Sequence, residues 1–318
     1  MTDRTGPTLH DAGEFAVIGA ITTGRAQPPG VTLGPGDDAA VISAPDGRVV
    51  VSTDMLVEGS HFRLDWSSPD EVGRKAIAQN AADIEAMGAR VTAFVVGFGA
   101  PPSTSVSAVA ELSDGMWQEA AAMGAGIAGG DMVSSPQWVV SVTVIGDLEG
   151  RDPVTRQGAR PGSVIAMAGE LGRSAAGFAL QHKGIGGFEE IRQLHRVPRP
   201  PYGQGAVAAK AGARAMTDVS DGLLADLGHI ALASGVELNL DSELLQPEAD
   251  AIAAAAAAAG ADPWALVLGG GEDHALVACF PDAVPPTWRV IGTVRDGAPQ
   301  VLLDGRPWTG PTGWQSYD

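Results

Sequence analysis

Three neighbouring stretches, RVVVSTD (residues 48–54), SPDEVGRKAIAQNAADIEAMGA (68–89) and RVTAFVVGF (90–98), decide the fold class. The first and the third are rich in β-branched residues, which favour strands. The middle stretch opens on Ser68 and Pro69, continues with acidic residues and closes on Gly88. These residues are typical of the start and the end of a long helix. The order of strand, helix and strand predicts an α/β fold.

The remaining sequence predicts a second domain. An alanine-rich helix before residue 124 and the strand WVVSVTVIGDL (138–148) complete a first unit near Gly150. After a turn-rich segment, strands are expected at SVIAMAG (163–169), ELNL (237–240), DHALVACF (273–280) and WRVIGTV (288–294), and a helix over the alanine run 251–260. A chain of 318 residues exceeds one ordinary core. We therefore expect domains at residues 1–150 and 151–318.

Composition and charge exclude several classes of protein. The chain is 45% apolar and 18% charged, as globular proteins are, and it lacks an apolar run of membrane-spanning length. Its 20 basic against 38 acidic residues give a net charge of −18, which argues against a nucleic-acid partner. The single cysteine, Cys279, permits no internal disulfide and no cysteine metal cluster, so a buried thiol is expected. We expect no membrane partner and a cytoplasmic location.

Carboxylates beside glycines or at the ends of apolar strands are the informative polar residues. Taken singly, each is more simply a helix cap or a turn residue. Six such sites, without a cysteine or histidine cluster, favour Mg²⁺ coordination by oxygen ligands. The motifs are GPGDDAAVI (Asp37, Asp38), VVVSTDMLVEGSHF (Asp54), NAADIEAMGA (Asp83), AGGDMV (Asp131), TDVSDGLLADLG (Asp218, Asp221) and LGGGEDHAL (Glu272, Asp273).

Magnesium in an acidic protein most often serves to bind phosphates, because the ion reverses the local negative field. This indicates phosphoryl transfer. The sequence contains no GxxxxGK[ST] loop and no protein-kinase set of lysine, HRD and DFG. ATP must therefore be bound by another design.

The motifs GDDAAVI, STDMLVEGSHF, NAADIEAMGA, AGGDM, TRQGARPG, DVSDGL and GGGEDHAL, in this order, resemble the thiamine-monophosphate kinase family. That family belongs to the ATP-binding superfamily of aminoimidazole ribonucleotide synthetase, and the resemblance runs from about Gly13 to Trp314. It implies an N-terminal α/β domain that dimerises through its sheet, a C-terminal α/β domain, and an ATP site in the cleft between them. It also implies that thiamine monophosphate is phosphorylated by ATP with several Mg²⁺ ions, in a homodimer.

The resemblance assigns roles to individual residues. Those implied as catalytic are Asp54, Asp131 and Asp221. Those implied as nucleotide contacts are Gly130, Asp131, Arg156 and Ser220. Those implied as substrate contacts are His61, Glu272 and Trp314. Those implied as magnesium ligands are Asp38, Ser52, Thr53, Asp54, Asp83, Asp131, Asp218 and Asp221.

Four of the residues implied to contact the nucleotide or the substrate also have a simpler structural explanation. His61 would ordinarily be a surface or core histidine, and Arg156 a solvated turn residue. Trp314 would otherwise fill a gap in the core, whereas its functional role is to stack on thiamine. Glu272 either caps a turn or accepts hydrogen bonds from the aminopyrimidine. The chain departs from the family by carrying His274 where an aromatic residue is common.

The resemblance also leads to an expected reaction mechanism and leaves other functions open. The acceptor is already an anionic phosphate, so we expect direct in-line transfer without a general base or a phosphoenzyme. Tyr317 is an alternative to Trp314 as the stacking residue. Selenophosphate synthetase and the hydrogenase-maturation dehydratase are alternatives within the superfamily, although Cys279 suits neither. A non-catalytic magnesium-nucleotide binding protein or an acidic scaffold is the alternative of another class.

Overall fold

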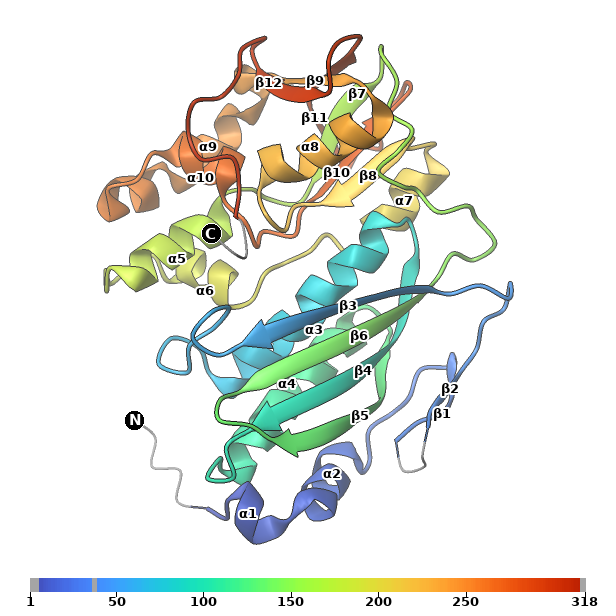
Figure 1. The fold of residues 1–318 in the computed structure, drawn as a ribbon, viewed down its shortest axis with the longest axis vertical. Helices are drawn as coiled ribbons and strands as arrows, with labels where there is room; N and C mark the ends of the chain where they lie inside the picture. Colours follow the sequence, from blue (N-terminus) through green and yellow to red (C-terminus); the bar gives the residue numbers. More distant parts are fainter. Residues whose placement is uncertain (1–5, 36–38, 315–318) are drawn as a thin grey trace. The chain divides into compact units, whose positions relative to one another are not determined.

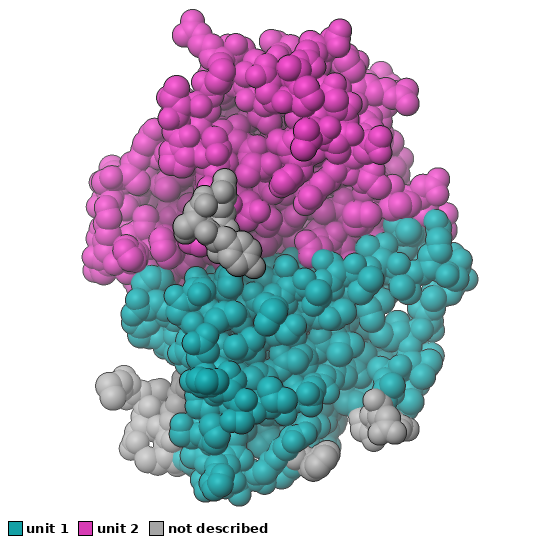
Figure 2. All heavy atoms as spheres, in the orientation of Figure 1, with its two compact units in different colours: residues 1–81, 91–149 teal, residues 82–90, 150–318 magenta. Residues whose placement is uncertain are grey.

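The chain forms two compact units in the computed structural model, which describes residues 6–35 and 39–314. Unit 1 comprises residues 1–81 and 91–149, and unit 2 comprises residues 82–90 and 150–318 (Figure 2). The expected boundary was near residue 150. Both units combine helices with a sheet, so the expected two-domain α/β fold is confirmed.

Unit 1 is built on a four-stranded sheet in the order β3-β6-β4-β5 (Figure 1). β3 pairs with β6 antiparallel and β4 with β5 parallel. The helices α3 and α4 cover one face of this sheet. The elements of the unit are α1 (Leu9–Ala12), α2 (Glu14–Thr22), β1 (Val31–Leu33), β2 (Val41–Ile42), β3 (Val50–Val57), α3 (Pro69–Ala86), β4 (Arg90–Ala100), α4 (Val106–Ala122), β5 (Gly126–Ser134) and β6 (Val139–Asp147). The end of α3 and the first residue of β4 fall within residues 82–90 and so belong to unit 2.

Two glycines allow α3 and α4 to touch through their backbones. A Cβ on Gly73 would overlap the carbonyl oxygen of Leu112, and a Cβ on Gly115 would overlap that of Asp70. Glycine normally weakens a helix interior, so its presence here has a packing reason.

The other face of the unit 1 sheet carries apolar side chains that are exposed in a single copy of the chain. Val51 and Met55 on β3 are 61% and 53% exposed, and Val133 on β5 is 59% exposed. Part of this face is covered, because Val31 of β1 packs against Ala93 and Ala128. Open apolar faces of this kind are uncommon on monomeric proteins.

Unit 2 contains a six-stranded sheet in the order β12-β9-β11-β7-β10-β8. Its central strands are buried on both faces: one face packs on α5, α8, α9 and α10, the other on α7. The elements are β7 (Val164–Ala168), α5 (Arg173–His182), α6 (Glu189–Arg196), α7 (Gln204–Lys210), β8 (Ala215–Asp218), α8 (Leu223–Ser234), β9 (Glu237–Leu240), α9 (Ser242–Ala259), α10 (Pro263–Gly269), β10 (Leu276–Phe280), β11 (Arg289–Arg295) and β12 (Gln300–Leu303).

Cys279 lies in β10 and is fully buried. Burial raises the pKa of its thiol to about 12, so the group stays protonated at neutral pH. The expected buried structural thiol is confirmed.

Within the described residues, no single helix is long and apolar enough to cross a membrane. Helices α9 and α10 satisfy the length and composition criteria only together, and the chain bends by 116° between them. Their apolar residues, among them Leu245, Ile252 and Val267, lie in the core of unit 2.

Two local expectations were wrong. AGGDMV is not a turn but part of strand β5, in which Gly130 pairs with Val96 and Asp131 with Gly97. Asp54 does not end its strand, because β3 continues to Val57 and pairs with β6 over its whole length. Both errors arise because strand pairing is a non-local interaction that short patterns do not report.

Helix α5 receives its N-terminal cap from a distant part of the chain. Its N-cap residue is Gly172, which has no side chain to accept a hydrogen bond. The carboxylate of Asp273 accepts instead from the backbone N–H of Gly172 (2.6 Å) and of Ser174 (2.8 Å). Burial raises the pKa of Asp273 to about 7 and outweighs the opposing effect of these bonds and of the charges on His274 and Arg173.

This raised pKa predicts a pH-dependent stability. Between about pH 4 and pH 7 the folded chain keeps a proton on Asp273 that the unfolded chain has lost. Stability therefore falls as pH rises through this window, by up to about 1.4 kcal/mol per pH unit, and levels off above it. Asp273→Asn removes the titration and should flatten the decline of Tm between pH 5 and pH 7. Asp282→Asn, at an exposed aspartate, is the control. Equal slopes of Tm against pH in wild type and Asp273→Asn would contradict the prediction.

Candidate active site

The loop between β8 and α8 collects three predicted site residues in unit 2. Asp218 is the last residue of β8, and Ser220 and Asp221 follow in the turn before α8. The buried carboxylate of Asp226 accepts from the backbone N–H of Asp221 (3.1 Å) and of Gly222 (3.0 Å). The turn is thus held by an acidic residue in the first turn of α8, as helix N-termini favour.

A second segment, GGGED, lies along this loop. The N–H of Glu272 donates to the carbonyl oxygen of Ser220 (2.7 Å), and the N–H of His274 donates to that of Val219 (2.9 Å). The two segments come so close that residue 271 must be glycine, because a Cβ there would overlap the carbonyl oxygen of Ser220. Glu272 is therefore placed beside Ser220, which the sequence predicted to contact the nucleotide.

Trp314 reaches the same loop from the C-terminal part of the chain. Its N–H donates to the carbonyl oxygen of Asp221 (2.9 Å), and its side chain is 66% exposed. The exposure contradicts the alternative that Trp314 fills a gap in the core. Unit 2 therefore brings Ser220, Asp221, Glu272 and Trp314 into one neighbourhood, although they are separated by up to 94 positions in the sequence.

Negative charge accumulates in this part of unit 2. Burial, followed by the charge of Asp218, raises the pKa of Asp226 to about 7. Asp83, from the last turn of α3, is close enough to act on the buried His274. Glu272 lies beside a second buried histidine, with its Oε2 3.4 Å from Nδ1 of His195. A field of this sign attracts cations.

In unit 1 the predicted metal residues divide between two strands. Ser52, Thr53 and Asp54 lie on β3. The Asp54 N–H donates to Oδ1 of Asn80 (3.1 Å), and its Oδ2 lies 3.5 Å from Nε2 of Gln79. The hydroxyl of Thr53 donates to the carbonyl oxygen of Val142 (3.0 Å).

Gly130 and Asp131 lie on β5 and are exposed. A Cβ on Gly130 would overlap the carbonyl oxygen of Val96, so the close contact of β5 with β4 requires glycine there. β3 and β5 are the two edge strands of the sheet, with two strands between them. At about 4.8 Å per strand they are about 14 Å apart, too far for Asp54 and Asp131 of one copy to bind the same ion.

His61 and Arg156 are surface residues. His61 follows β3, its Nδ1 accepts from the N–H of Val57 (3.0 Å), and its carbonyl oxygen accepts from the buried Lys75 ammonium (2.9 Å). Arg156 is exposed in the loop before β7, and its carbonyl oxygen accepts from the hydroxyl of Ser234 (3.2 Å). The structure thus fixes the backbone of both residues.

Asp37, Asp38 and Tyr317 lie outside the described residues. In the part of the chain that the structure describes, no three histidine, cysteine, aspartate or glutamate side chains converge on a point where they could hold a metal ion. Sequence reasoning missed Asp226, although its position in the first turn of a helix after a glycine is a recognisable capping signal.

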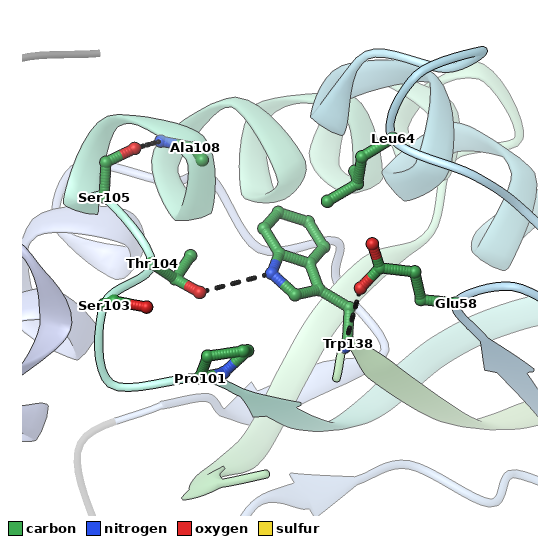
Figure 3. A pocket seen from close by; sticks show the side chains of 8 residues that line it. All are labelled: Glu58, Leu64, Pro101, Ser103, Thr104, Ser105, Ala108 and Trp138. Atoms are coloured by element: carbon green, nitrogen blue, oxygen red, sulfur yellow. Dashed lines mark hydrogen bonds between the residues drawn. The ribbon is translucent and has the colours of Figure 1, made fainter. Parts of the chain in front are cut away.

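Unit 1 also has an open pocket of about 360 Å³, lined by none of the predicted site residues. Figure 3 shows the Trp138 indole between Thr104 and Leu64, with Nε1 donating to Oγ1 of Thr104 (3.3 Å). The carboxylate of Glu58 accepts from the N–H of Trp138 (3.1 Å). This pocket is lined mainly by the loop that precedes α4 and not by the residues of β3 and β5 that were predicted to bind metal.

Two family models match the sequence. The N-terminal domain of AIR synthase related protein matches residues 36–148, and the C-terminal domain of AIR synthase related protein matches residues 160–303. Together they cover most of both units.

Named relatives match over nearly the whole length. The thiamine-monophosphate kinase of Mycobacterium tuberculosis (strain ATCC 25618 / H37Rv) is 66% identical, covering 98% of this chain and 93% of the relative. That of Corynebacterium glutamicum is 44% identical, covering 99% and 96%. A solved structure of AaThiL complexed with AMPPCP and TMP aligns with a TM-score of 0.78 at 29% identity, covering 98% of this chain and all of that one. The chain belongs to the thiamine-monophosphate kinase family and is built from the two domains of AIR synthase related proteins.

Proposed function

We propose that this protein transfers the γ-phosphoryl group of ATP to thiamine monophosphate, producing thiamine diphosphate and ADP. The observation that carries the proposal is the identity of 66% with a thiamine-monophosphate kinase over 98% of the chain. It is supported by the solved relative that was complexed with AMPPCP, an ATP analogue, and with TMP. The grouping of Ser220, Asp221, Glu272 and Trp314 in unit 2 is compatible with a site that binds both molecules.

Several Mg²⁺ ions are part of the proposal. The available donors are carboxylate and hydroxyl oxygens, which suit Mg²⁺. Mg²⁺ is commonly held by one or two carboxylates, with substrate phosphates and water as the other ligands, so the lack of a preformed triad among the described residues fits this ion. When bound, it would neutralise charge on the phosphates. The proposed ligands are Asp38, Ser52, Thr53, Asp54, Asp83, Asp131, Asp218 and Asp221.

The remaining residues would bind and orient the two substrates. Arg156 and Ser220, with Gly130, are proposed to contact the nucleotide, and a guanidinium fork matches phosphate oxygens. Glu272 would accept hydrogen bonds from the aminopyrimidine of thiamine. The exposed Trp314 indole offers a face on which the cationic thiazolium can stack, and His61 would contact the same substrate.

The function is tested by measuring thiamine diphosphate formed from ATP, Mg²⁺ and thiamine monophosphate, with thiamine as the control acceptor. Asp54→Asn removes a charged oxygen ligand, so we expect kcat to fall by about 100-fold or more while the circular dichroism spectrum stays unchanged. Asp65→Asn, at an exposed aspartate of the same unit, is the matched control and should stay near wild type. A wild-type protein that forms no thiamine diphosphate would overturn the proposed function.

We further propose direct in-line transfer. An oxygen of the substrate phosphate forms the new bond to the γ-phosphorus as the bond to the leaving oxygen of ADP breaks. The nucleophile is already an anion, so no general base is required. One direct displacement inverts the configuration at phosphorus. ATP made chiral at the γ-phosphate should therefore give inverted product, and retention would demonstrate a phosphoenzyme instead.

A homodimer that shares its sites explains the separation of Asp54 from Asp131. Each residue lies on a different edge strand of unit 1, about 14 Å from the other, and the open sheet face carries Val51, Met55 and Val133. Asp131 lies on the open face with Val133, whereas Asp54 alternates with Val51 and Met55 and faces α3. A second copy docked on this sheet would therefore bring its Asp131 to Asp54 of the first around the edge strand β3. The cytoplasmic location and the absence of nucleic-acid and membrane partners stay predictions.

The shared site predicts complementation between two inactive variants. Asp54→Asn and Asp131→Asn, produced together with different tags and purified through both, give heterodimers with one intact site and one doubly altered site. We expect about half of the wild-type activity from such heterodimers, although each variant alone is inactive. Inactive doubly tagged protein would show that the sites are not shared, and no doubly tagged protein would show that the chain does not dimerise.

A further inference from the structure

The side chain of His274 is bonded to a predicted metal ligand deep inside unit 2. Its Nδ1 lies 3.1 Å from Oδ2 of Asp218, and the two residues are only 5% and 4% exposed. A carboxylate accepts and cannot donate when ionised, so the ring nitrogen is the donor. Hydrogen bonds to a buried charged group are among the stronger ones in proteins.

The backbone holds His274 in an uncommon conformation. Its φ is +53°, a left-handed value that few residues other than glycine adopt. The N–H of the same residue donates to the carbonyl oxygen of Val219, next to Asp218 in sequence. Backbone and side chain of His274 thus contact two consecutive residues of the loop, which fixes the ring against the carboxylate.

Three carboxylates, those of Asp218, Glu272 and Asp83, lie close enough to act on the ring. The hydrogen bond from Nδ1 gives Asp218 a fixed partner within this acidic group.

We propose that His274 is a positioning residue for Mg²⁺: its Nδ1–H holds Oδ2 of Asp218, so that Oδ1 of that carboxylate is the oxygen that would bind the cation. The inference rests on the proposed Mg²⁺-dependent function and deepens it. Partners that hydrogen-bond to a ligating carboxylate fix its orientation, and losing one typically lowers metal affinity 10- to 100-fold. His274 touches neither substrate in this role and acts through Asp218.

The test compares a variant that keeps a donor with one that does not. His274→Asn retains an N–H donor and tolerates a positive φ, whereas His274→Phe retains a ring without a donor. The first readout is the Mg²⁺ concentration that gives half of the maximal Tm shift, with Mg²⁺ alone as the ligand and no nucleotide. We expect this concentration to rise about tenfold in His274→Phe and less than about threefold in His274→Asn.

The second readout separates positioning from a loss of structure. At saturating Mg²⁺, kcat of His274→Phe should recover towards wild type, because a misplaced ligand weakens binding without removing it. If His274→Phe does not fold, His274→Gly takes its place, since glycine accepts the positive φ and lacks the donor. An unchanged Mg²⁺ requirement in the donor-free variant, or equal losses in both variants, would overturn the inference.

The outcomes also distinguish this inference from the proposed function. A wild-type protein that binds Mg²⁺ through a His274-dependent site, yet forms no thiamine diphosphate, would support the inference and overturn the function. An active kinase whose half-saturating Mg²⁺ concentration is the same in wild type and in His274→Phe would support the proposed function and overturn the inference.

Discussion

Two backbone hydrogen bonds, from Glu272 N–H to Ser220 and from His274 N–H to Val219, are the contacts on which the rest of the unit 2 site depends. They bring the segment before β10 against the segment after β8. Because β10 pairs directly with β8, the sheet itself sets the position of both segments. A change in the register of these strands would displace the carboxylates of both segments together.

The glycines around this contact have a steric role. Gly271 lies against Ser220, and Gly270 would overlap the carbonyl oxygen of Leu266 if it carried a Cβ. None of Gly269, Gly270 and Gly271 has a positive φ, so close approach and not conformational freedom explains the glycine run. The run lets main chain approach main chain, which places the partly exposed Glu272 and the buried His274 against the β8–α8 loop.

Sequence patterns predicted the long helices and strands and the family of the protein. They did not predict where the predicted site residues lie relative to one another in the sheets. The helix expected over 68–89 is α3, because capping residues and closing glycine are local signals. The strand β5 was missed, because AGGDMV is rich in glycine and only its parallel partner β4 makes it a strand. The family resemblance singled out Asp54 and Asp131, but it did not indicate that they lie on opposite edges of a sheet. That separation depends on strand order, which no short motif encodes.

The buried Cys279 makes this chain convenient for site-specific chemistry. Maleimides and related reagents attack the thiolate, and a thiol whose pKa is about 12, inside a strand covered on both faces, supplies almost none at neutral pH. A cysteine introduced at an exposed position away from the open sheet of unit 1, such as Leu232 on α8, would then be the only reactive one in the sequence. Spectroscopic labels can thus be attached to the surface of unit 2 without first replacing a native cysteine.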